Sequence, residues 1–104
     1  MPNFVLTYRQ PVGYTPAPET MATWMAWFDD MDGQLVDPGK PVVERATIGN
    51  TTSGVTELGG YSIVRAEDLQ TALALAKGCP LLDHGGTVEV GRLGEVPELK
   101  RATE

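Results

Sequence analysis

Only a few side chains in this 104-residue chain could carry out acid–base chemistry, and the single histidine is the first of them. His84 follows Asp83 and lies in an expected loop, residues 79–86. Imidazole exchanges protons near neutral pH, so His84 is the candidate general acid or base. Side chains of adjacent residues diverge, so a carboxylate brought in by folding, such as Asp37, is as good a partner as Asp83. The alternative interpretation is a loop histidine that contacts only water or a backbone carbonyl.

Aromatic side chains supply the other candidates. Tyr8 ends the first expected strand, where its hydroxyl could hold a substrate oxygen in a cleft; the alternative is a tyrosine tip in solvent. Trp24 and Trp27 share an expected helix that faces the sheet, so they either line a small apolar pocket or pack in the core. The predicted catalytic residues are His84, Asp37 and Tyr8, and the predicted ligand contacts are Trp24, Trp27 and Asp83.

Metal and cofactor chemistry finds little support in the sequence. One histidine and one cysteine cannot supply the ligands of a zinc site, and neither a GxGxxG motif nor a complete phosphate loop occurs. We therefore predict no metal and no cofactor. Cys79 follows an expected helix C-terminus, where the helix dipole raises a thiol pKa. This residue is predicted to be a small buried apolar group and not a nucleophile.

The elements that must position these side chains follow from hydrophobic periodicity. The expected order is strand, helix, strand, strand, helix, strand, over residues 3–9, 18–35, 43–49, 58–66, 67–78 and 87–93. The polar stretch 50–54 is expected to be a hairpin tip. Apolar residues at helical spacing predict the buried stripe of the first helix, with Trp27 just off it: Met21, Trp24, Phe28, Met31 and Leu35. In the second helix, Glu67 or Asp68 is the expected cap and the stripe is Leu69, Ala72, Leu73 and Ala76.

This order of elements is the ferredoxin-like double βαβ arrangement of the α+β class, with an antiparallel sheet. Right-handed crossovers place both helices on one face of that sheet. In the strand at 58–66, alternation directs Ser62 and Val64 to one face and Tyr61 and Ile63 to the other. The face without helices therefore carries apolar groups, and monomers seldom expose such a patch. A second copy of the chain is the expected cover, which makes a homodimer.

Composition limits the classes of partner. Hydrophobic residues make up 41% and charged residues 21%, as in a globular domain, and the net charge is −6. The eight basic residues are scattered, so nucleic acids and anionic membranes are poor candidates. The N-terminus lacks the pattern of a secretion signal, and a single cysteine fits a reducing compartment, so we expect a cytoplasmic protein. Residues 1–93 are expected to form one domain and residues 94–104 a partly mobile tail.

Several motifs resemble a known family. The stretch LGGYSIVRAEDLQTALALAKGCPLLDHGGTVEV is similar to the C-terminal half of the YCII-related proteins, the group that includes the DGPF-domain proteins. Its GGY, GCP and GGTVEV segments carry the likeness, and FVLTY and LVDPGKPV in the first half resemble one branch of that family. The resemblance covers roughly residues 3–93. It implies a dimeric α/β-barrel, in which two ferredoxin-like sheets pack face to face, and a small-molecule cleft in each protomer.

The resemblance also implies two functions that stay open here. Some relatives are discussed as enzymes of aromatic and lactone breakdown with a His–Asp pair, which suggests a cofactor-independent enzyme acting by proton transfer on a small polar or aromatic molecule. The alternative is a ligand-binding or regulatory dimer without catalysis. The chain departs from the family because the DGPF motif is missing, with 50–57 as a shortened substitute, and the first helix has no histidine. A His84–Asp37 pair would therefore replace the family's pair.

Overall fold

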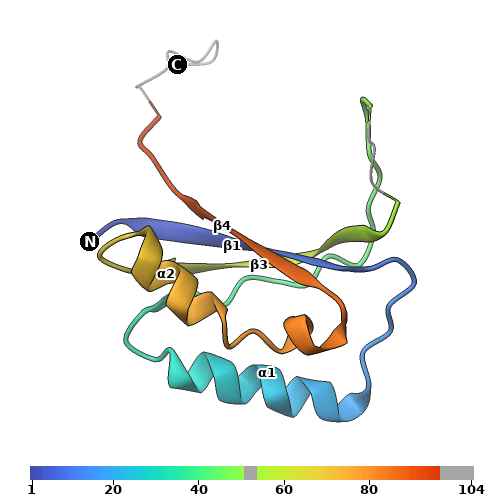
Figure 1. The fold of residues 1–104 in the computed structure, drawn as a ribbon, viewed down its shortest axis with the longest axis horizontal. Helices are drawn as coiled ribbons and strands as arrows, with labels where there is room; N and C mark the ends of the chain where they lie inside the picture. The colour runs from blue at the N-terminus through green and yellow to red at the C-terminus, as the bar shows by residue number, and fades with distance from the viewer. Residues whose placement is uncertain (51–53, 97–104) are drawn as a thin grey trace, which may run out of the picture.

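The computed structural model describes residues 1–50 and 54–96. It contains a four-stranded antiparallel sheet in the order β2-β3-β1-β4, with both helices on one face (Figure 1). The elements are β1 (Asn3–Pro11), α1 (Pro18–Asp30), β2 (Leu35–Asp37), β3 (Thr56–Arg65), α2 (Leu69–Ala76), the short 3-10 helix η1 (Pro80–His84) and β4 (Thr87–Arg92). The predicted ferredoxin-like α+β fold is confirmed.

The two central strands alternate between a buried face and an uncovered face. On β1, Phe4, Leu6 and Tyr8 are at most 5% exposed and face the helices. On β3, Ser62 and Val64 are fully buried on that same face, as the alternation of the sequence predicts. The core of the protein therefore lies between the helices and this one side of the sheet.

The second strand is not where the sequence placed it. Residues 43–49 form no strand, and β2 is instead Leu35–Asp37, which pairs with Val64 and Ile63 of β3. Helical spacing had assigned Leu35 to α1. The helix ends at Asp30 because aspartate carboxylates interact unfavourably with the negative end of the helix dipole. Gly33, which also disfavours a helix, follows shortly after. The chain is thereby released early enough for Leu35 to join the sheet.

The buried stripe of α1 is rotated from the predicted one. Trp27, expected just off the stripe, is only 7% exposed, whereas Met21, expected within it, is 67% exposed. The buried residues of the helix, Thr20 and Trp27, lie seven positions apart, and Met31 at its C-cap continues that row. Because this row begins with the polar residue Thr20, the spacing of apolar residues did not predict that this face is buried.

Helix α2 begins as predicted and packs differently along its length. Asp68 is the N-cap, and its side chain accepts a hydrogen bond of 2.8 Å from the backbone N–H of Thr71. Ala72 is buried as expected, but Leu69 and Leu73 are 45% and 37% exposed. Small residues allow the helix to approach the sheet closely, and the larger leucines of the predicted stripe remain at its margin.

Two further expectations concern segments near the limits of the described chain. Of the predicted hairpin tip, residues 51–53 lie outside the described residues, as do residues 97–104 of the predicted tail. Leu93 directly follows β4, and its N–H still donates to the carbonyl of Asn3. Within 1–50 and 54–96, no helix has both the length and the apolar character needed to span a membrane.

Candidate functional site

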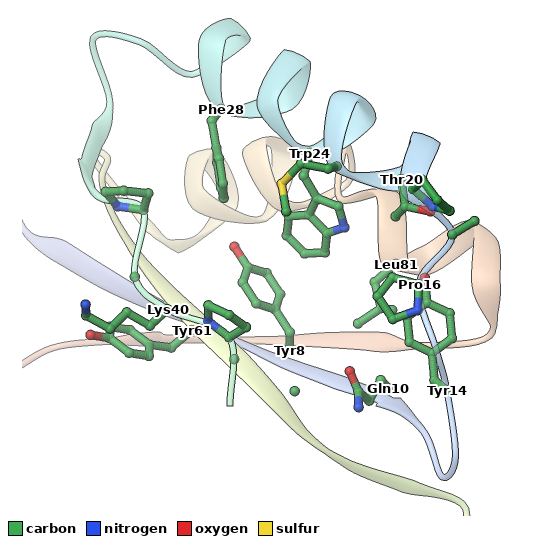
Figure 2. Close-up of a pocket in the computed structure, with 18 residues that line it drawn as sticks. Tyr8, Gln10, Tyr14, Pro16, Thr20, Trp24, Phe28, Lys40, Tyr61 and Leu81 are labelled. Atoms are coloured by element: carbon green, nitrogen blue, oxygen red, sulfur yellow. The ribbon is translucent and has the colours of Figure 1, made fainter. Parts of the chain in front are cut away.

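A cavity of about 430 Å³ lies between α1 and the two central strands of the sheet, β1 and β3. Figure 2 shows the aromatic side chains of α1 on one side and the strands on the other. Trp24 and Phe28 come from α1, Tyr8 comes from β1, and Leu81 of η1 closes one end. The segment 38–41, which follows β2, forms the remaining wall. The lining is mainly apolar, and the volume suits a molecule of one or two rings.

Segment 38–41 is shaped by a compact turn. The Asp37 carboxylate accepts a hydrogen bond of 2.8 Å from the backbone N–H of Gly39, as in turns that aspartate initiates. Gly39 has a φ of +74°, which glycine adopts without strain. Pro41 then forms an isolated bridge with Gly60 of β3. The turn is thus held against the sheet, and its backbone becomes part of the cavity wall.

The aromatic residues of the site form one connected cluster. The rings of Tyr8 and Trp24 meet edge to face with centroids 4.9 Å apart, and Trp24 and Trp27 are 5.6 Å apart. The indole N–H of Trp27 donates to the carbonyl of Leu75 over 3.1 Å, which ties α1 to α2. Trp24 lines the cavity and Trp27 does not. The two tryptophans therefore divide the predicted roles, one as pocket wall and the other as core.

Two hydrogen bonds link Tyr8 of β1, through Ser62 of β3, to the turn that follows β2. The Tyr8 hydroxyl donates to Ser62 Oγ over 2.7 Å, and Ser62 Oγ donates to the carbonyl of Pro38 over 2.6 Å. Tyr8 is 5% exposed and Ser62 is fully buried. Burial raises the pKa of Tyr8 well above its ordinary value of 10. Tyr8 is therefore a neutral phenol at physiological pH, suited to hydrogen bonding and not to removing protons.

Three other predicted site residues, His84, Asp83 and Asp37, do not line the cavity. His84 and Asp83 are both exposed on η1, and the His84 ring lies 5.9 Å from that of Tyr14, which does line the cavity. Asp37 ends β2, at the opposite sheet edge from β4, so about 14 Å of strand spacing separates the two edges. Among the described residues, no salt bridge joins His84 to a carboxylate. Tyr8 and Trp24 are therefore in contact, whereas Asp37 ends one edge strand and His84 precedes the other.

Charge is sparse around the cavity. Of the described residues that line it, Lys40 alone is charged, and it is exposed at the rim. Gln10 also lines it, with its amide donating to Glu57 over 3.1 Å, and Glu57 forms a 3.1 Å ion pair with Arg45. Within the described part of the chain, no three His, Cys, Asp or Glu side chains group to hold a metal ion. The site is thus an apolar chamber with a few fixed hydrogen-bonding groups.

Cys79 behaves as the sequence predicted. The side chain is 3% exposed, and burial raises the pKa of its thiol to about 11. Such a thiol carries little thiolate at neutral pH, so it packs as a small apolar group.

Sequence reasoning missed two parts of the site. Ser62 was placed on the buried face of its strand, yet its hydroxyl was given no role. A buried hydroxyl needs a hydrogen-bond partner, so its position among apolar residues was the available signal. The contact of segment 38–41 with β3 was missed as well, because it depends on tertiary packing that residue spacing does not reveal.

A βαββαβ domain with one cavity between its first helix and its sheet defines a ferredoxin-like protein with a small-molecule-sized site. The model of the YCII-related domain matches residues 1–95, so the chain belongs to the YCII-related domain family. No curated protein matches the chain. Among solved structures, it is similar to 5-chloro-2-hydroxyhydroquinone dehydrochlorinase from Burkholderia phenoliruptrix AC1100 in complex with 2,5-dihydroxybenzoquinone. The TM-score is 0.56 and the identity 18%, over 89% of this chain and 95% of that one. This likeness shows the shared fold.

Proposed function

We propose that the protein binds a small, flat, mostly apolar molecule, of the size of a substituted aromatic ring, in the cavity between α1 and the sheet. The observation that carries this proposal is the 430 Å³ chamber walled by Trp24, Phe28 and Tyr8. Aromatic side chains supply large contact area to a planar ligand at small entropic cost. The few polar groups at the wall would orient the ligand.

The ligand in the similar solved structure gives a size to compare with the cavity. The similar dehydrochlorinase was solved with 2,5-dihydroxybenzoquinone, which is a planar six-membered ring with oxygen substituents. A ligand of that size fits the volume of the present cavity. At 18% identity the comparison carries the fold, so the ligand class rests on the lining of this chain's own cavity.

The second part of the proposal is that the protein forms a homodimer. The sheet face opposite the helices is uncovered in one chain (Figure 1), and Val5 and Ile63 pair directly across it. Both side chains are only partly buried. Packing this face against its copy would remove apolar surface from water and complete the two-sheet assembly of the ferredoxin-like half-barrels. Stable interfaces of this kind bury about 800 Å² on each partner.

Binding is tested with p-cresol, a neutral one-ring probe. A ligand that binds only the folded state raises the melting temperature as its concentration rises. We expect p-cresol to raise the melting temperature of the protein and to perturb backbone NMR signals of α1 and segment 38–41. Trp24→Ala should weaken both effects, whereas Met25→Ala, on the same helix with half of its side chain exposed and outside the cavity, should not. Perturbations confined to the uncovered sheet face would contradict the proposal.

A second candidate function is proton transfer on such a ligand, with His84, Asp37 and Tyr8 as the predicted catalytic groups. The observation in its favour is the 5.9 Å between the rings of His84 and Tyr14, a residue of the cavity wall. Movement of the Tyr14 ring would open His84 to the bound molecule. The test is chloride release from 5-chloro-2-hydroxyhydroquinone. This candidate predicts turnover that His84→Gln abolishes, and turnover unchanged by that substitution would exclude His84 as the base.

A further inference from the structure

The direction of the hydrogen bonds between Tyr8, Ser62 and Pro38 is fixed by chemistry. A carbonyl oxygen only accepts, so the 2.6 Å contact with the Pro38 carbonyl requires the hydroxyl proton of Ser62. Ser62 has no second proton, so its oxygen can only accept in the 2.7 Å contact with Tyr8. The single hydroxyl proton of Tyr8 is therefore committed to Ser62 and is not available to a ligand.

This commitment leaves Tyr8 with one kind of capacity toward a ligand. A phenolic oxygen that has donated its proton still carries lone pairs. Tyr8 lines the cavity, and Figure 2 shows its hydroxyl oxygen directed toward the aromatic side chains of α1. Burial holds Tyr8 neutral but does not remove this accepting capacity. A molecule in the cavity thus meets an acceptor at Tyr8.

The directions of the two hydrogen bonds that join Tyr8, Ser62 and the Pro38 carbonyl cannot be reversed. Ser62 is fully buried, so no solvent molecule reaches it to supply an alternative partner. The Pro38 carbonyl belongs to the turn that the Asp37–Gly39 hydrogen bond holds against β3. The series of hydrogen bonds ends at that carbonyl, so it cannot pass a proton onward. These hydrogen bonds fix Tyr8 as an acceptor toward the cavity and do not transfer protons.

We propose that Tyr8, held by Ser62, makes the cavity selective for ligands that present a hydrogen-bond donor, such as an aromatic ring with a free hydroxyl or N–H. This inference rests on the proposed function and names its ligand class. A ring that presents only a carbonyl or ether oxygen at Tyr8 places two acceptors against each other. The desolvated ligand oxygen then has no partner, which costs binding free energy.

The test uses three para-substituted toluenes of similar shape. p-Cresol can donate, 4-methylanisole can only accept, and p-xylene can do neither. Dissociation constants are measured by NMR titration for the wild-type protein and each variant. The ratios of affinity within one protein are then compared between proteins, as in a double-mutant cycle, so the differing hydrophobicity of the probes cancels.

Tyr8→Phe removes the acceptor. We expect the affinity for p-cresol relative to p-xylene to fall about tenfold, the value of one buried hydrogen bond. Tyr14→Phe is the matched control, because Tyr14 also lines the cavity but lies outside the chain of hydrogen bonds. An equal fall in both variants would overturn the assignment to Tyr8. Circular dichroism and the melting temperature establish that each variant is folded.

Ser62→Ala gives the sharper result. Without Ser62, the Tyr8 proton is free to turn toward the cavity, so Tyr8 can donate as well as accept. We expect the affinity for 4-methylanisole relative to p-xylene to rise severalfold, while p-cresol still binds. A serine with a merely structural role predicts the same loss for all three probes. An unchanged 4-methylanisole ratio in this variant overturns the proposal.

The outcomes separate this inference from the proposed function. If none of the three probes binds the wild-type protein, the proposed aromatic site is wrong and the inference falls with it. If all three bind with ratios that Tyr8→Phe leaves unchanged, the site stands and only the donor selectivity is wrong.

Discussion

Gly39 lies so close to Tyr61 that a β-carbon on Gly39 would stand 1.7 Å from the Tyr61 carbonyl oxygen. Its φ of +74° also disfavours any L-residue. Gly39→Ala should therefore destabilise the protein by at least about 2 kcal/mol. The measurement is urea unfolding followed by fluorescence. The control is Gly33→Ala, where a β-carbon would meet nothing within 4 Å. Equal stability of the two variants would show that the turn is not clamped to β3.

The two tryptophans should separate stability from binding. Trp27 is 7% exposed and its indole N–H holds the Leu75 carbonyl, so Trp27→Phe should lower the free energy of unfolding by about 2–3 kcal/mol. Trp24→Phe should cost about 1 kcal/mol or less, because Trp24 is only partly buried, yet weaken p-cresol binding more than Trp27→Phe does. Denaturant titrations and probe titrations on the same two variants give both comparisons. The reverse order in either would contradict the division of roles.

The cap of α2 makes a definite pH prediction. Hydrogen bonds from Thr71, first from its backbone N–H and then from its hydroxyl, hold the pKa of Asp68 below its ordinary value of 3.8. A carboxyl whose pKa is lower in the folded state stabilises the fold above its unfolded pKa. That contribution is lost as pH falls through the folded value. Asp68→Asn keeps a capping side chain without the charge. The melting temperature of this variant should fall less between pH 5 and acidic pH than that of the wild type.

The uncovered sheet face should set the oligomeric state. Ile63 pairs with Val5 at the centre of that face, so Ile63→Lys places a charge where two sheets would meet. We expect size-exclusion chromatography with light scattering to report a dimer for the wild type and a monomer for Ile63→Lys. Gln70→Lys, which adds a charge at an exposed position of α2 on the other face of the sheet, is the control. A monomeric wild-type protein would remove the homodimer from the proposal.

The fold was more accessible from the sequence than the site. Alternation along the strand around Tyr61 and Ser62 determines which face each residue takes, and that assignment is local. The error at β2 arose because Leu35 satisfies both helical spacing and strand pairing, and only pairing with Val64 decides between them. Trp27 was predicted to lie just off the buried stripe because the buried row of α1 begins with Thr20, a polar residue.

The site depends on contacts between residues distant in the chain. Tyr8 and Ser62 are 54 positions apart, and their hydrogen bond depends on the β1–β3 register. Sequence alone selected Tyr8 and Trp24 through their chemistry but could not place the Pro38 carbonyl beside Ser62. The His84–Asp37 pair stays a prediction, since the two residues flank strands at opposite edges of the sheet.

The most direct test of the aromatic site is a crystal or NMR structure of the protein with p-cresol bound. The account predicts the ring between Trp24 and segment 38–41, with the cresol hydroxyl donating to the Tyr8 oxygen at about 2.7–2.8 Å. A ring bound elsewhere, or a cavity filled only by water at saturating p-cresol, would contradict it.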